Sequence, residues 1–257
     1  MARNVRPPET EVLTMITLRR AGERSYGRHR RQEVWRTFDP ENGADELANG
    51  FGTLETLDEE RFAPGAGGSR RPHRDTEIVT FVREGTLSHE DSTGRSGVIQ
   101  AGEFQRMTSG RGIRHSETNA SRTDSAHAFQ IGLRPSEADL ESSQEQRRFS
   151  AAERRDGLCV VASQDGRRGS LHIHQDALIF SAILDIGQHV VHELAPGRRA
   201  WLHLVEGGLS LGDLVLSVGD GVGVTAERAV SFTALEATSI LLLELGERSN
   251  GRGGAAG

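Results

Sequence analysis

The chain has 257 residues, a formal net charge of −6 and 35% hydrophobic residues, which suits one large or two ordinary domains of a soluble protein. Its basic residues are all arginines, and no basic run is long enough for a DNA-binding arm, so we expect no direct nucleic-acid binding. A single cysteine excludes an internal disulfide, no apolar stretch reaches the roughly 18 residues that span a membrane, and the first residues lack the apolar core of a secretion signal. We therefore expect a cytoplasmic protein with no membrane partner.

The elements expected along the chain are short strands. The run "MITLRRAGER" predicts a first strand from Met15, which leaves residues 1–14 as a disordered extension. Alternating β-branched runs that end at glycines follow, such as "TEIVTFVREG", "RAWLHLVEG" and "DLVLSVGDG", and they are typical of all-β barrels or sandwiches. Polar residues 135–155 predict a helix-compatible connector. It would join a first domain, residues 15–134, to a second, residues 156–247, before a disordered tail, residues 248–257.

The two halves carry a weak internal repeat, which predicts two barrels of similar size. A strand, a Glu-Gly turn and a second strand occur in "IVTFVREGTLSHEDSTGRSGVIQAGE" and again in "AWLHLVEGGLSLGDLVLSVGDG". The histidines and glutamate of the first half's candidate site have no counterparts in the second half. There, His203 stands alone on an apolar strand and is expected to be a core residue. His172 and His174 share a strand face, and we expect them to have a structural or interdomain role.

The first half holds the stronger candidate site. His115 and Glu117 lie two residues apart on an expected strand, so both side chains should point to one face, and His73 begins an earlier strand. Two imidazoles and a carboxylate with open positions form the facial triad of non-haem Fe(II) oxygenases. Glu77, four residues after His73, is a candidate for an additional carboxylate ligand. The alternative is that each is an ordinary surface or hydrogen-bonded polar residue.

The first half also resembles a known family. The run "RRPHRDTEIVTFVREGTLSHEDSTGRSGVIQAGEFQRMTSGRGIRHSE", with "EQRRF" and "GSLHIHQD" further on, is similar to the pirin family, and most of all to its bacterial members described as quercetin 2,3-dioxygenases. The resemblance implies an all-β fold of two tandem cupin barrels (double-stranded β-helix, jelly-roll-like), here with a short helical connector. It also implies one divalent metal, usually Fe(II), in the first barrel and none in the second.

One departure from the family pattern concerns the expected ligands. The family motif reads His-Pro-His where this chain has Arg71, Pro72 and His73, so three ligands carry over: His73, His115 and Glu117. A guanidinium about 4 Å from a dication, at an effective dielectric of about 20, would be repelled by of order 8 kcal/mol. Arg71 therefore either turns to the barrel mouth and binds an anionic substrate beside a three-ligand metal, or it replaces the metal and pairs with Glu117 or Glu77.

Two functions follow from these alternatives. With metal bound, the chain is expected to be a dioxygenase that acts on a flavonol or a related enediol, with Glu117 as the base for a substrate hydroxyl. Without metal, it is expected to be a pirin-like binding or regulatory protein for an anionic metabolite or a protein partner. A non-oxidative cupin enzyme, such as an isomerase, is a third alternative.

Overall fold

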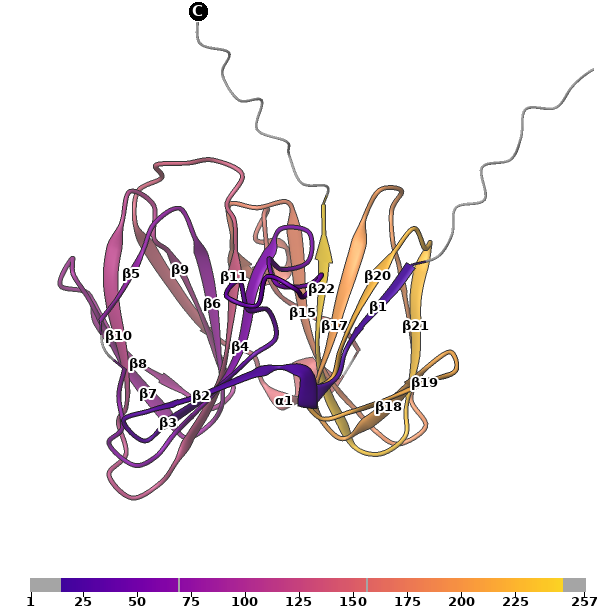
Figure 1. Cartoon of the computed structure of the whole chain (residues 1–257), viewed down its shortest axis with the longest axis horizontal. Helices are drawn as coiled ribbons and strands as arrows, with labels where there is room; N and C mark the ends of the chain where they lie inside the picture. The colour runs from indigo at the N-terminus through magenta and orange to yellow at the C-terminus, as the bar shows by residue number, and fades with distance from the viewer. Residues whose placement is uncertain (1–14, 69, 156, 247–257) are drawn as a thin grey trace, which may run out of the picture.

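The structure is a computed structural model that describes residues 15–68, 70–155 and 157–246. Its strands form two barrels that lie side by side (Figure 1). Each barrel contains a seven-stranded and a four-stranded sheet, and a cluster of buried hydrophobic side chains lies between the two sheets of each barrel. The predicted all-β fold of two barrels is confirmed. The ends expected to be disordered, residues 1–14 and 248–257, lie outside the described residues.

The first barrel pairs its strands in the orders β12-β9-β6-β11-β4-β3-β2 and β5-β10-β7-β8. These strands are β2 (Ser25–His29), β3 (Gln32–Arg36), β4 (Leu54–Phe62), β5 (Arg71–His73), β6 (Glu77–Glu84), β7 (Thr86–Asp91), β8 (Ser96–Gln100), β9 (Glu103–Thr108), β10 (Ile113–Asn119), β11 (Ala126–Leu133) and β12 (Ser143–Arg148). The neighbouring strands are antiparallel, so residues that oppose one another across a ladder point to the same side.

The second barrel has the sheet orders β1-β20-β17-β22-β15-β13-β14 and β16-β21-β18-β19. Its strands are β1 (Met15–Arg19), β13 (Cys159–Ser163), β14 (Leu171–His172), β15 (Ala177–Leu184), β16 (His189–Glu193), β17 (Arg199–Glu206), β18 (Gly208–Leu211), β19 (Leu214–Ser217), β20 (Gly221–Thr225), β21 (Ala229–Ala234) and β22 (Thr238–Leu245). The helices are short: α1 (Ala151–Arg155) and the 3-10 turns η1 (Ala21–Glu23) and η2 (Arg167–Gly169). No helix within the described ranges is long and apolar enough to cross a membrane.

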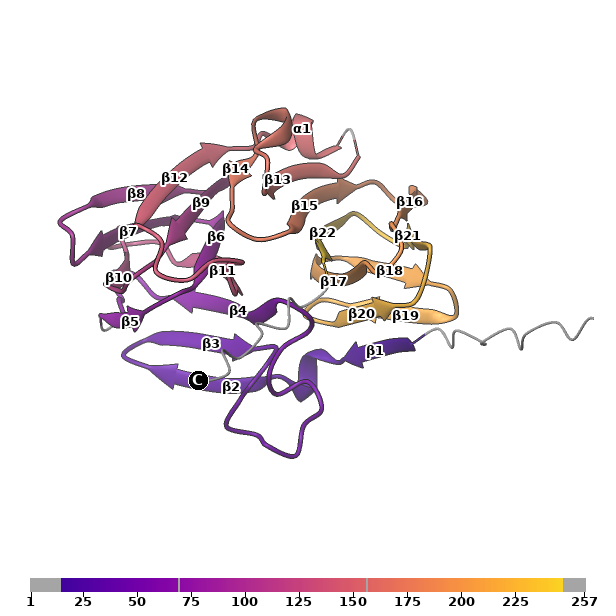
Figure 2. The same cartoon turned by 90° about the horizontal axis from the view of Figure 1, so that it is seen from above.

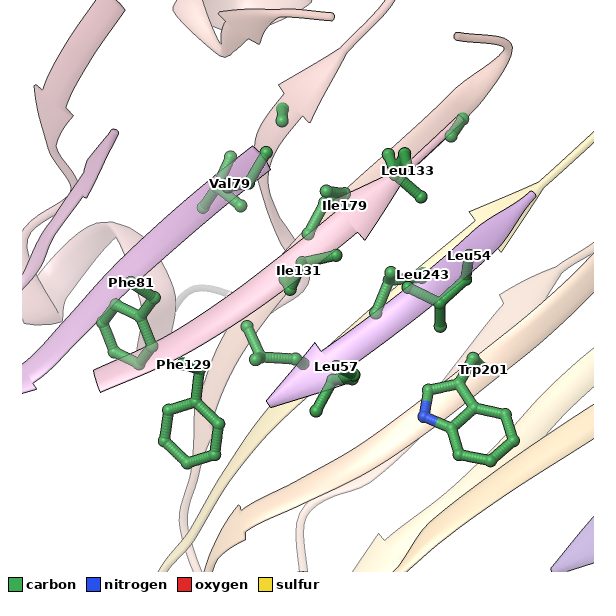
Figure 3. Packing of buried hydrophobic residues seen from close by; sticks show 14 of the residues in the cluster. Leu54, Leu57, Val79, Phe81, Phe129, Ile131, Leu133, Ile179, Trp201 and Leu243 are labelled. Carbon is green, nitrogen blue, oxygen red and sulfur yellow. The ribbon is translucent and has the colours of Figure 1, made fainter. Parts of the chain in front are cut away.

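The two seven-stranded sheets pack against each other and form the largest apolar core of the molecule (Figure 3). Leu57, Phe129 and Ile131 come from the first barrel, and Ile179 and Trp201 come from the second. Side chains of this size each contribute about 1.5–3 kcal/mol on burial. This core fixes the two barrels relative to each other, and the interior of the first barrel holds both the smaller apolar cluster and buried polar residues such as His115 and Glu117.

Two domain boundaries differ from the prediction. The predicted strand at Met15 is present, but β1 pairs with β20 and therefore belongs to the second barrel (Figure 2). Residues 135–155 contain strand β12, which pairs with β9, and only five helical residues in α1. β12 lies at a sheet edge and its side chains are mostly exposed or half-buried, so it lacks the apolar alternation that reveals a strand in a sequence.

Candidate metal centre

Strands β5 and β10 bring the predicted histidines together inside the first barrel. β5 pairs with β10 so that Arg71 opposes His115 and His73 opposes Ile113. Along β10, His115 and Glu117 are buried and alternate with residues that are more exposed, which confirms that these two side chains share the inner face. The spacing of two residues thus places an imidazole and a carboxylate in the barrel.

The two imidazole rings lie close together, and their protonation state suits metal binding. The ring centroids of His73 and His115 are 4.7 Å apart, and within the described residues their buried Nε2 and Nδ1 atoms, respectively, have no hydrogen-bond partner. Burial lowers the pKa of both groups, that of His115 to about 4, and the charge of nearby Arg71 lowers both further. Both rings are therefore neutral at pH 7, and a neutral imidazole with a free lone pair is a metal ligand.

Glu117 lies in the same interior, but other residues hold its carboxylate. Thr80 donates a hydrogen bond to Oε1 at 3.3 Å, and the amide of Gln130 donates one to Oε2. Burial and the charge of neighbouring Glu60 raise the pKa of Glu117, and Arg71 opposes this shift. In the part of the chain that the structure describes, no three His, Cys, Asp or Glu side chains close around an ion. In this arrangement Thr80 and Gln130, and not the two imidazoles, hold the carboxylate of Glu117.

Arg71 forms an ion pair with a carboxylate that the sequence analysis missed. Its Nη1 atom lies 3.2 Å from Oε1 of Glu60 on β4, and Gln32 also hydrogen-bonds to Glu60. The predicted partners, Glu117 and Glu77, were therefore wrong as direct ion-pair partners. The sequence feature that points to this partner is the acidic run of Asp58, Glu59 and Glu60 within a strand. Side chains alternate along a strand, so Asp58 and Glu60 lie on the side opposite Glu59.

Glu77 points away from this site, so its prediction as an additional ligand was wrong. Thr80 reaches Glu117 from the inner face of β6, and Glu77, three residues earlier, lies on the opposite face. There its Oε1 atom lies 3.1 Å from Nδ1 of His174. The prediction treated residues 73–77 as one strand, but β5 ends at His73 and Asp75 has a left-handed backbone (φ 48°). The contact with His174 gives that histidine the interdomain role expected for it.

Two neighbouring cavities are lined by several of these residues. The inner cavity has a volume of about 10 Å³, the size of about one water molecule, and Glu60, Arg71, His115 and Glu117 are among its lining residues. The outer cavity, of about 500 Å³, lies beside the β2–β3 hairpin. Both are lined by Gln32, Gly68 and Arg71. Arg71 thus stands between the buried centre and the outside.

Comparison with known proteins identifies the family. Residues 22–133 match the family model described as Pirin, and residues 160–245 match the model described as Quercetinase C-terminal cupin domain. The quercetin 2,3-dioxygenase of Escherichia coli K12 is 38% identical over 231 residues, which cover 90% of this chain and 99% of that protein. The chain belongs to the pirin family. A putative quercetin 2,3-dioxygenase of Mycobacterium tuberculosis is 34% identical over 93% of both chains.

Solved structures of bacterial pirins have the same fold. The crystal structure of YhhW from Escherichia coli is 38% identical, covers 91% of this chain and 98% of its own, and superposes with a TM-score of 0.86. A second structure, of the bacterial pirin YhhW in complex with nickel(II), has 37% identity and a TM-score of 0.85, and it covers 91% of this chain and all of its own. The tandem cupin fold is therefore shown for this pirin, and a metal complex is known for a relative.

Proposed function

We propose that this pirin binds one divalent metal, Fe(II), between His73, His115 and Glu117, and that it catalyses oxygen-dependent cleavage of a flavonol or related enediol. The observation that carries the proposal is the pair of facing imidazoles, each with a buried nitrogen that has no partner in the described structure. Two imidazoles and a carboxylate suit a first-row divalent metal. The relatives named as quercetin 2,3-dioxygenases, and the nickel(II) complex of one relative, support the same assignment.

The charges around Arg71 are compatible with a dication. Asp58, Glu60 and Glu117 all feel the charge of Arg71, and Asp58 and Glu60 also feel that of Arg36; all three carboxyl groups have raised pKa values, chiefly because they are buried. If all three ionise, they exceed the charge of the two guanidiniums by one negative charge, so added positive charge would be favoured there. Glu60 pairs directly with Arg71 and so offsets part of the charge that would repel a metal.

The chain's own residues have separate tasks in this reaction. A bound metal would act as a Lewis acid and as a template for the substrate. Glu117, whose pKa is raised by burial, is suited to accept a proton from a substrate hydroxyl near neutral pH. Arg71 keeps donors free for an anionic substrate, because only Nη1 bonds to Glu60 among the described contacts.

Metal analysis followed by an oxygen-consumption assay tests this function. The purified protein should contain metal or take up Fe(II), and its consumption of oxygen with quercetin should require the metal and vanish in Glu117→Ala. Arg155→Gln, at an exposed site on α1, is the matched control and should retain activity. Bound metal should also raise the melting temperature until a chelator removes it. Full metal loading without turnover of quercetin or a simpler enediol would contradict the proposal.

The second candidate function is a metal-free pirin that binds an anionic metabolite or a protein partner. Two observations favour it: Arg71 already forms an ion pair with Glu60, and Gln130 holds the carboxylate of Glu117. This function predicts a protein that contains no metal after gentle purification. Its melting temperature would not respond to a chelator or to added Fe(II), which separates it from the oxygenase.

A further inference from the structure

The outer cavity is lined by positively charged side chains. Arg28, Arg36 and Arg71 are among the described residues that line it, and none of its lining residues is acidic. The whole chain carries a net charge of −6, so this concentration of guanidinium groups differs from the average surface. Buried Asp58 and Glu60 offset part of the charge of Arg36 and Arg71, and a bound anion at the exposed ends of the arginines would offset more of it.

Two of these guanidiniums keep hydrogen-bond donors for a ligand. The Arg71 side chain is 41% exposed and bonds to Glu60 through Nη1 alone. Arg36 forms no ion pair shown in the described structure, although Asp58 opposes it across the β3–β4 ladder and its charge lowers the pKa values of Asp58 and Glu60. Its guanidinium lies over Gly27, where a Cβ atom would come within 3.2 Å of Nη1. Glycine at position 27 therefore leaves room for the arginine beside the cavity.

The outer cavity is a neighbour of the inner cavity at the proposed metal centre. Arg71 and Gln32 line both cavities, and His115 and Glu117 line the inner one. A ligand in the outer cavity would therefore lie among the arginines, with Arg71 and Gln32 between it and the inner cavity that His115 and Glu117 line. The planar fork of an arginine binds a carboxylate or phosphate through two parallel hydrogen bonds.

We propose that the outer cavity selects substrates that carry an oxyanion in addition to the reacting enediol, and that Arg36 and Arg71 bind this oxyanion. The substrate class is a small planar enediol or catechol with a carboxylate, sulfate or phosphate substituent. The assignment of the reacting end rests on the proposed function, whereas the oxyanion site rests only on the lining of the outer cavity.

Binding of a matched pair of ligands tests this inference without any turnover. We would titrate 3,4-dihydroxybenzoate and catechol, which differ only by a carboxylate, into metal-loaded and chelator-treated protein by calorimetry. The carboxylate compound should bind at least tenfold more tightly, and the preference should fall as salt rises. Arg36→Gln should reduce the preference to within about threefold, whereas the exposed control Arg155→Gln should leave it unchanged. These fold-changes correspond to about 1.4 kcal/mol for each factor of ten.

The possible outcomes separate this inference from the proposed function. Equal binding of the two compounds, or a preference that survives in Arg36→Gln, would overturn the oxyanion site. Competition by inorganic phosphate would extend the ligand class from carboxylates to phosphates, and its absence would restrict the class to carboxylates. A carboxylate preference in metal-loaded protein that consumes no oxygen would support the site and count against the oxygenase.

Discussion

Replacing Arg71 by histidine is the most informative change at the proposed centre. Arg71→His removes a permanent cation and offers a third imidazole opposite His115 on the paired strand. At a separation of about 8 Å, the spacing of diagonal neighbours on paired strands, and an effective dielectric of about 20, a guanidinium repels a dication by about 4 kcal/mol.

The surroundings of Arg71 reduce this repulsion. Glu60 lies 3.2 Å from its Nη1 atom, and 41% exposure of the side chain adds solvent screening. A reduction by about half leaves about 2 kcal/mol, or a factor of about 30 in the metal dissociation constant. Arg71→Gln should show this gain from loss of charge alone, and Arg71→His should exceed it through the added ligand.

Competition titration with a chromophoric chelator measures these affinities for Fe(II) or Ni(II). The expected order of affinity is wild type, then Arg71→Gln, then Arg71→His as the tightest. If neither variant binds metal more tightly than the wild type, the charge of Arg71 does not limit metal binding and the placement of the centre is refuted.

Three further changes test the electrostatics and the packing of the structure by urea unfolding. Burial lowers the pKa of His203 from 6.5 to about 3. The folded protein should therefore lose up to about 1.4 kcal/mol of stability for each pH unit below 6.5. His203→Phe should remove this loss. Burial raises the pKa of Asp58 to about 7, so the contribution of its protonated form to stability is lost as pH rises through 7. Asp58→Asn should therefore stabilise the folded protein more at pH 8 than at pH 4. Phe129→Ala should cost about 3–5 kcal/mol, because Phe129 is buried between the barrels. A flat pH profile, or a loss below 1 kcal/mol for Phe129→Ala, would contradict these assignments.

Local strand alternation was enough to predict part of the site. His115 and Glu117 share a face because side chains alternate along any strand, whatever that strand pairs with. The same reasoning predicted that His203 is a core residue, and it is fully buried. The short apolar runs between glycines likewise predicted an all-β chain, since their length and period favour strands, and the internal repeat predicted two barrels.

The partners of each strand depended on the tertiary structure. Glu60 meets Arg71 because the fold brings β4 and β5, from different sheets, to one cavity, and the alternation of either strand does not contain that information. Glu77 faces away from the candidate site because the chain bends after β5. β1 joins the second barrel through its pairing with β20. Sequence alone therefore determined which way each side chain leaves its own strand, because that is a local property of the backbone. Only the folded structure decided which charges meet, because contacts between distant strands depend on how the sheets close.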